Sequence, residues 1–211
     1  MSILRSVSAT APDAGVLRDA AAALAAGGIV AYPTDTFYGL AVDPRDGDAV
    51  RRLFAAKGRA REVAVPLVAA DADQVGAHVG ELSAMARRLA DAFWPGPLAL
   101  VIPAGSRLAA ELHAGRGTVA VRVPAHAVAV GLARAAGHPI TATSANRSGD
   151  PPAREAAEVV TAMGDAVALV LDAGACAGGL PSTIVDVTAG EPRLVRAGAV
   201  PWDRVLRSLE A

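Results

Sequence analysis

The sequence has little cysteine, few aromatic residues and no long apolar run, and each shortage excludes a class of protein. Cys176 is the one cysteine among 211 residues, so an intramolecular disulfide cannot form, which is typical of a reducing compartment. No apolar run reaches the ~18 residues that a membrane span needs, and the N-terminus lacks the apolar stretch of a signal peptide. We therefore expect a cytoplasmic protein that makes no membrane contact.

Several signatures of nucleotide and metal sites are also missing. The chain has neither the phosphate-binding loop GxxxxGK[ST] nor a glycine-rich dinucleotide motif. Its histidines are scattered and never fall at zinc-ligand spacing (His78, His113, His126 and His138). The net charge of −1 provides no general attraction for nucleic acid. A nucleotide site in this chain is therefore not of the Walker type, and no protein-bound metal is expected.

The remaining composition and the hydrophobic pattern predict one α/β domain. Apolar residues make up 53% and charged residues 19% of the chain, as in globular proteins, but aromatics are only 3%, so aliphatic side chains must fill the core. Helical and strand-like patterns alternate, which favours a layered α/β fold. Helices are predicted at 13–26, 46–57, 81–93, 127–136, 153–163 and 201–209. Strands are predicted at 29–32, 63–69, 98–102, 118–123, 139–143, 167–171, 183–187 and 193–196.

Polar residues gather in the loops that follow these strands, where α/β proteins place their sites. Lys57 is the only lysine among 20 basic Lys and Arg residues, and it stands two positions before Arg59 at a helix end. A compact ammonium beside a planar guanidinium suits a polyphosphate, although cations also stabilise a helix C-terminus without any ligand. Ser144 and Asn146 crowd a turn after a strand, with no positioned His and Asp that would indicate acyl-enzyme chemistry.

Arg122 lies inside the apolar strand TVAVRVPAH, on the face opposite Val119 and Val121. A buried guanidinium needs an anionic partner. One interpretation is a structural Asp or Glu, and the other is a substrate carboxylate gripped by two parallel hydrogen bonds.

These motifs together resemble the YrdC/TsaC family of threonylcarbamoyl-AMP synthases over nearly the whole chain. The matching stretches, in the family's order, are AYPTDTFYGLAVD, KGR, WPGPLALV, TVAVRVPAH, ITATSANRSG, PSTIVD and LVRAG. The resemblance implies a single domain over 1–211, with its core at about 13–200, in which an open twisted mixed sheet with flanking helices surrounds a deep basic cavity. It implies a nucleotidyltransferase that forms threonylcarbamoyl-AMP and pyrophosphate from L-threonine, bicarbonate and ATP. It further implies that Mg²⁺ is held mainly by the ATP phosphates, and that downstream transfer proteins pass the threonylcarbamoyl group to position 37 of tRNA.

The resemblance also assigns residues. The family's Lys-x-Arg and Ser-x-Asn signature falls on four residues expected to bind ATP and support catalysis: Lys57, Arg59, Ser144 and Asn146. Further ATP contacts are expected from Thr118 and Arg196, and threonine contacts from Thr36, Arg122, Ala142 and Ser182. The chain departs from many relatives after this Lys-x-Arg, where Ala60 replaces a common Pro. Two alternatives stay open: a paralogue that binds nucleotide without the synthase activity, and an RNA-binding module. A weak contact with tRNA or other RNA is a further expectation.

Overall fold

The computed structural model describes residues 3–58 and 64–210. Within these residues the α-helices are α1 (Ala14–Ala25), α2 (Gly47–Lys57), α3 (Ala72–His78), α4 (Ala84–Phe93), α5 (Ala127–Ala136), α6 (Ala156–Met163) and α7 (Trp202–Glu210). The strands are β1 (Ile3–Ser6), β2 (Val30–Tyr32), β3 (Gly39–Ala41), β4 (Leu67–Val68), β5 (Leu98–Pro103), β6 (Thr118–Arg122), β7 (Ile140–Thr141), β8 (Thr143–Ser144), β9 (Leu169–Asp172), β10 (Thr183–Asp186) and β11 (Arg193–Arg196). Two short 3₁₀ helices, η1 (Ala110–His113) and η2 (Gly164–Ala166), complete the elements.

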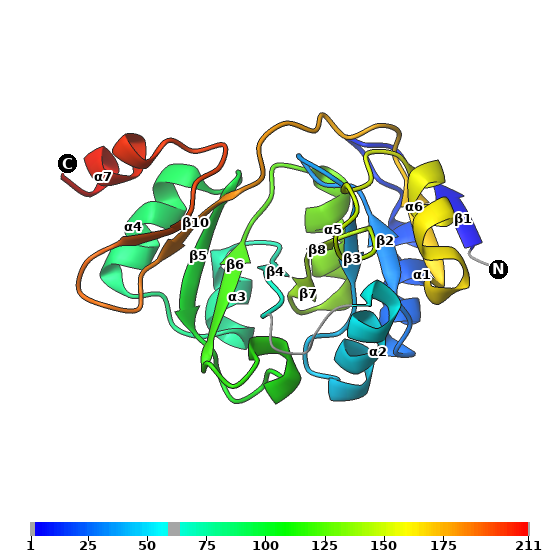
Figure 1. The fold of residues 1–211 in the computed structure, drawn as a ribbon, viewed down its shortest axis with the longest axis horizontal. Helices are drawn as coiled ribbons and strands as arrows, with labels where there is room; N and C mark the ends of the chain where they lie inside the picture. Colours follow the sequence, from blue (N-terminus) through cyan, green and yellow to red (C-terminus); the bar gives the residue numbers. More distant parts are fainter. Residues whose placement is uncertain (1–2, 59–63, 211) are drawn as a thin grey trace.

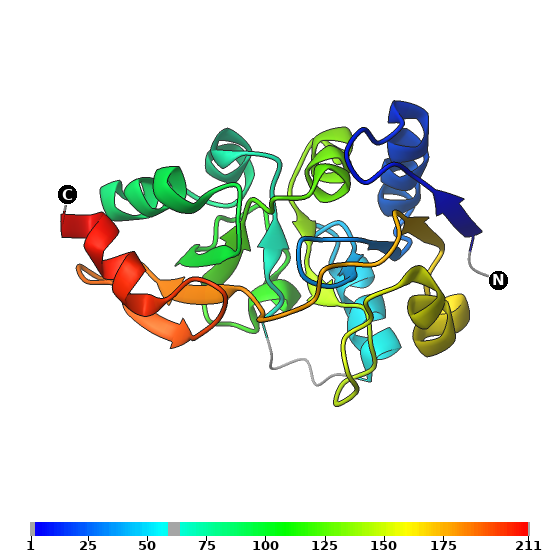
Figure 2. The ribbon, with the colours of Figure 1, turned by 90° about the horizontal axis from the view of Figure 1, so that it is seen from above.

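The prediction of a mixed α/β fold is confirmed, and hydrogen bonding divides the strands into two sheets. The first has the order β1-β9-β2-β3-β8 and the second β11-β10-β5-β6-β4-β7, and both contain parallel and antiparallel pairs. Figure 1 shows the first sheet on the side of the N-terminus and the second on the side of the C-terminus. Seen from above in Figure 2, the two halves lie side by side along the long axis.

The chain passes directly from one sheet to the other at Ala142. Sequence analysis predicted one strand over 139–143, but here β7 pairs with β4 and β8 pairs with β3. The backbone N–H of Ala142 donates to the carbonyl of Pro66 at 2.8 Å, between the two pairings. A single extended segment therefore contributes a short strand to each sheet.

Helices cover both faces of the first sheet. Val30 and Tyr32 on β2 belong to a buried cluster with side chains of α1 and α5 such as Leu17 and Leu132. Ala31 faces the other way and joins the larger core that includes α2 and α6. This alternation is the period-two pattern of a strand buried on both faces.

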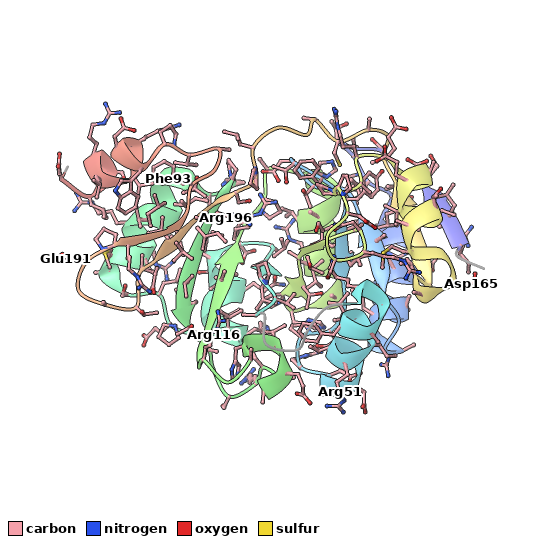
Figure 3. The ribbon with its side chains drawn as sticks, in the orientation of Figure 1. Arg51, Phe93, Arg116, Asp165, Glu191 and Arg196 are labelled. Carbon is pink, nitrogen blue, oxygen red and sulfur yellow. The ribbon has the colours of Figure 1, made fainter. Side chains whose placement is uncertain are left out.

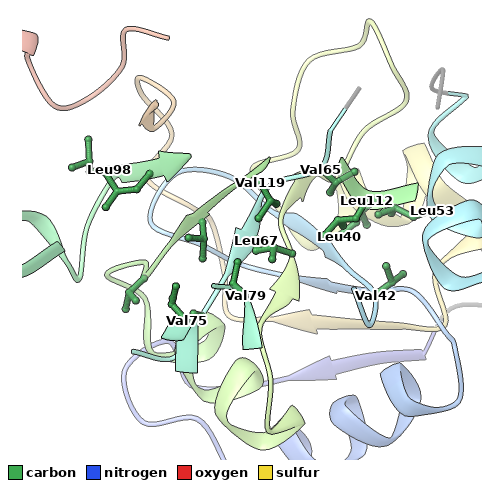
Figure 4. Packing of buried hydrophobic residues seen from close by; sticks show 14 of the residues in the cluster. Leu40, Val42, Leu53, Val65, Leu67, Val75, Val79, Leu98, Leu112 and Val119 are labelled. Atoms are coloured by element: carbon green, nitrogen blue, oxygen red, sulfur yellow. The ribbon is translucent and has the colours of Figure 1, made fainter. Parts of the chain in front are cut away.

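The second sheet buries one face and leaves the other for the cavity described below. Leu98, Leu100 and Ile102 on β5 pack in the larger core, together with Val119 and Val121 on β6. Figure 4 shows part of this core, in which Leu98 and Val119 are labelled. The prediction that Val119 and Val121 share the face opposite Arg122 is consistent with their burial in this cluster.

Sequence analysis did not predict β1, β3 or α3, and it placed some helix starts too early. The helix predicted from 81 begins at Ala84, because the Ser83 hydroxyl accepts a hydrogen bond from the N–H of Ala86 and caps it. The helix predicted from 153 begins at Ala156 after a capping box formed by Glu155 and Glu158. Among the helices of the described residues, none is long and apolar enough to cross a membrane.

Candidate functional site

A cavity of about 560 Å³ lies between the two sheets. Its walls come from the β2–β3 loop, the strands β4, β5, β6, β10 and β11, and the segment after β8. Among the described residues, the charged side chains that line it are Arg122, Arg196 and Asp150. Two of these three side chains are arginines, and Asp35, the carboxylate that pairs with Arg122, is not among the described lining residues.

The β2–β3 loop is folded into a tight turn by its own hydroxyl groups. The Thr34 hydroxyl donates to the carbonyl of Phe37 at 2.7 Å and accepts from the N–H groups of Thr36 and Phe37 at 3.2 and 3.3 Å. Such side-chain-to-backbone bonds are the reason Thr is favoured in turns. They place Thr36 on the wall of the cavity.

Arg122 has the structural partner that sequence analysis left open, and it also lines the cavity. Its Nη1 donates to both carboxylate oxygens of Asp35, at 2.7 and 2.9 Å, and approaches the carbonyl of Gly96 at 3.4 Å. The two side chains of this pair are only 9% and 15% exposed. Within residues 3–58 and 64–210, every hydrogen bond of Arg122 uses Nη1. The pair therefore fixes one edge of the guanidinium and leaves Nη2 and Nε for an anion in the cavity.

Arg196 approaches the cavity from the edge of the second sheet (labelled in Figure 3). Its Nε and Nη2 donate to the carbonyl of Ser182 at 3.1 and 2.8 Å. The close approach of this segment to residues 181–182 requires glycine at position 198, because a Cβ on Gly198 would lie 2.2 Å from the carbonyl oxygen of Pro181. Partial burial and then the positive charge of Arg122 lower the pKa of Arg196. Two guanidinium groups thus border the same cavity, and their positive charges favour the binding of a multiply charged anion there.

The turn after β8 forms the third wall. Ser144 and Asn146 line the cavity, whereas Lys57 is 4% exposed and is not among the described lining residues. The Lys57 Nζ donates to the carbonyl of Ser144, and to the carbonyl and Oδ1 of Asn146 at 2.8 and 3.2 Å. The structure thus brings Lys57, Ser144 and Asn146 together, as three members of the expected ATP-binding set, through direct contact of the Lys57 ammonium with the turn.

The structure brings most of the predicted site residues to this one cavity. Those that line it are Thr36, Arg122, Ala142, Ser144, Asn146, Ser182 and Arg196. Thr118 is half-buried at the start of β6 and is not among the described lining residues; it lies four positions, or about 13 Å, from Arg122 along the strand. Arg59 lies outside the described residues.

Sequence reasoning missed Asp150, the one acidic residue among the described cavity walls. It directly follows the stretch ITATSANRSG, and that adjacency was the available signal. Its backbone is held at both polar groups: the N–H donates to the carbonyl of Arg147 at 3.1 Å, and the carbonyl accepts from Asn146 Nδ2 at 2.6 Å. In the described part of the chain, no group of three or more His, Cys, Asp or Glu residues could hold a metal ion.

The chain thus has a mixed α/β fold with a cavity between its two sheets, and the described walls of that cavity carry two arginines and one aspartate. The Sua5/YciO/YrdC family model, described as telomere recombination, matches residues 22–198. The chain therefore belongs to the Sua5/YciO/YrdC family, as the resemblance of its motifs implied.

Several of the proteins similar to this chain are named threonylcarbamoyl-AMP synthase. Threonylcarbamoyl-AMP synthase of Chromohalobacter salexigens is 42% identical over 176 residues, which cover 83% of this chain and 94% of that protein. The synthase of Pyrococcus abyssi is 37% identical over 90% of this chain, which spans only 56% of that longer protein. The crystal structure of P. abyssi Sua5 complexed with L-threonine matches with a TM-score of 0.92 and 35% identity, covering 99% of this chain and 61% of the other.

Proposed function

We propose that this protein is an L-threonylcarbamoyladenylate synthase, a nucleotidyltransferase that forms threonylcarbamoyl-AMP and pyrophosphate from L-threonine, bicarbonate and ATP. The relatives described above bear this name, and one of them was crystallised with L-threonine. The observation that carries the proposal is the pair Arg122 and Arg196 facing one cavity beside the Ser144–Asn146 turn. Two guanidiniums and a polar turn suit a carboxylate and a phosphate chain held side by side.

Threonine occupies the part of the cavity near the β2–β3 loop in this proposal. Arg122 offers Nη2 and Nε to the threonine carboxylate while Asp35 holds Nη1. Thr36 and Ser182 supply hydroxyl groups to the polar atoms of the substrate, and Ala142 leaves room for it. Held in this way, the threonine amine faces the space shared with the nucleotide.

ATP occupies the part bounded by Arg196 and by Ser144 and Asn146, with Arg59 and Thr118 as further contacts from the family pattern. The threonine ammonium and bicarbonate give the carbamate, with loss of water and a proton. A carbamate oxygen then attacks the α-phosphorus, and the bond to the pyrophosphate oxygen breaks in line. The described residues supply orientation and positive charge rather than a proton-transfer base.

Asp150 fits the Mg²⁺ that accompanies ATP. Mg²⁺ is usually held by one or two carboxylates together with substrate phosphates, rather than by a cage of protein ligands. Asp35 is engaged by Arg122, whereas the Asp150 carboxylate borders the cavity and has no hydrogen bond or ion pair within the described residues. A bare carboxylate would repel a triphosphate, so a cation between them resolves the conflict. When bound, the ion neutralises charge on the phosphates and on the departing pyrophosphate.

The product is a mixed carbamic–phosphoric anhydride, which water hydrolyses. We therefore propose that a downstream threonylcarbamoyl-transfer protein receives it before the group reaches position 37 of tRNA, and that any contact of this chain with tRNA itself is weak.

The test is pyrophosphate release by the purified protein with ATP, Mg²⁺, bicarbonate and L-threonine, each omitted in turn. The expected result is release that needs all four, and a threonylcarbamoyl-AMP mass by mass spectrometry. ATP binding without such release would favour the paralogue that lacks synthase activity. Salt-sensitive RNA binding without ATP binding would favour the RNA-binding alternative.

The variant Arg122→Gln tests the assignment of Arg122 to threonine within the same assay, and Arg207→Gln is its matched control. Arg122→Gln should raise the KM for threonine at least about 10-fold, because a neutral amide replaces the bidentate grip on the carboxylate. Arg207 pairs with Asp203, an exposed neighbour on α7, and does not line the described walls of the cavity, so its loss should leave both KM values unchanged.

A further inference from the structure

The ammonium group of Lys57 is enclosed by oxygen atoms of the turn that lines the cavity. A lysine has three N–H donors and no acceptor. Three acceptors surround Nζ: the carbonyl of Ser144, the carbonyl of Asn146 at 2.8 Å, and Asn146 Oδ1 at 3.2 Å. The side chain is 4% exposed. Ser144 and Asn146, two residues that line the cavity, thus accept hydrogen bonds from this buried ammonium.

A second connection ties the same turn to the end of α2. The carbonyl of Lys57 accepts a hydrogen bond from the N–H of Ser148 at 2.8 Å. Gly58 ends the helix in the left-handed conformation, with φ of 61°, so the chain leaves α2 without disturbing this contact. Lys57 therefore holds the turn with its side chain at one end and its backbone at the other.

Asn146 transmits this anchoring to the wall of the cavity. Its Oδ1 accepts from Lys57, while its Nδ2 donates to the carbonyls of Arg147 at 2.9 Å and Asp150 at 2.6 Å. Both ends of the amide are engaged, which fixes its orientation. One buried ammonium and one amide thus connect the end of α2 with both ends of the loop from Ser144 to Asp150.

We propose that Lys57 is a positioning residue, which acts on ATP by holding the Ser144–Asn146 turn rather than by contacting a phosphate. The inference rests on the proposed function, since it concerns the same nucleotide site. It explains why the one lysine of the chain stands here. A compact ammonium can donate to three converging oxygens, whereas the planar fork of an arginine cannot.

A double-mutant cycle between Lys57 and Asn146 tests this, with the dissociation constant of a non-hydrolysable Mg²⁺–ATP analogue measured by calorimetry. If Lys57 acts through the turn, Lys57→Met and Asn146→Ala should each raise the dissociation constant about 10-fold. The double variant should then bind the analogue little more weakly than either single variant. In the control cycle, the effects of Lys57→Met and Arg196→Gln on the dissociation constant should multiply, because Arg196 contacts a different wall at Ser182. Multiplying effects in the first cycle would overturn the proposal.

Lys57→Arg covers the case in which Lys57→Met does not fold. It keeps the charge but loses the geometry, so it should weaken binding as much as Lys57→Met; retention within about 3-fold would indicate direct phosphate contact instead. Hydrogen exchange of the Ser148 amide in the ligand-free protein gives a readout independent of ATP. Faster exchange in Lys57→Arg than in the parent chain is expected, and unchanged exchange would overturn the proposal. If the parent chain binds no ATP while this exchange result holds, the proposed function alone has failed.

Discussion

Replacing Asp35 by Asn removes the negative partner of a buried guanidinium with little change in shape. Asp35 and Arg122 are joined by hydrogen bonds of 2.7 and 2.9 Å, and both side chains are largely enclosed. Removing one member of a buried ion pair costs about 3–5 kcal/mol, because the other charge stays buried without compensation. This pair borders a cavity and Asn retains one acceptor, so we expect the lower end, about 3 kcal/mol.

The assay is urea unfolding followed by circular dichroism, with a thermal melt beside it. For a domain of this size, each kcal/mol lowers Tm by roughly 2–4 °C, so Asp35→Asn should lower Tm by roughly 6–12 °C. Asp203→Asn is the matched control, since its pair with Arg207 is 70% exposed at both ends. That control should change the free energy of unfolding by less than about 0.5 kcal/mol.

Substrate binding provides the second readout. Asp35→Asn should raise the KM for threonine and leave the KM for ATP near its parent value, because only the orientation of Arg122 changes. A stability loss no larger than that of Asp203→Asn would refute the energetic reasoning. An equal rise in both KM values would refute the assignment of Arg122 to threonine.

Three further outcomes are expected. Arg196→Gln should raise the KM for ATP about 10-fold and leave the KM for threonine unchanged, in steady-state assays of pyrophosphate release. Asp150→Asn should weaken Mn²⁺ binding in the presence of the ATP analogue, followed by electron paramagnetic resonance, while affinity for metal-free adenosine is retained. Burial acts to raise the pKa of Asp43, but hydrogen bonds from Arg45 and the charge of His138 outweigh it, so the pKa lies below its usual range. Its stabilising contribution is present above the unfolded pKa of about 4 and is lost as pH falls through the folded value, so Asp43→Asn should flatten the decline of unfolding free energy in that acidic window.

The sequence predicted the long elements well because their signals are local. The glycine after α5 and the apolar spacing of α2 are readable without any partner strand. β3 was missed because it is three residues long and exists only through pairing with β2 and β8. β7 and β8 read as one strand because no local signal at Ala142 announces that two different neighbours pair on its two sides.

The site was predicted to a similar degree and for similar reasons. Arg122 could be identified as a candidate from its own strand, since an arginine inside an apolar strand needs an anionic partner. Its pairing with Asp35 could not, because that contact depends on the fold. The contact of the buried Lys57 ammonium with the Ser144–Asn146 turn could not be read from the spacing, because residues 57 and 144 meet only in three dimensions. Asp150 was missed because its one signal was its position directly after ITATSANRSG, and an Asp at such a position is also an ordinary turn residue.

The segment through Ala142 also constrains how the protein can respond to its ligands. Because β7 and β8 are separated by one residue and are paired to different sheets, the two walls of the cavity are joined there by continuous, hydrogen-bonded backbone. The walls cannot separate at that line without breaking strand pairing. An adjustment of cavity width on binding that keeps this pairing must therefore leave residues 140–144 in place, and it has more freedom at the opposite edge of the second sheet, where Arg196 lies on the edge strand β11.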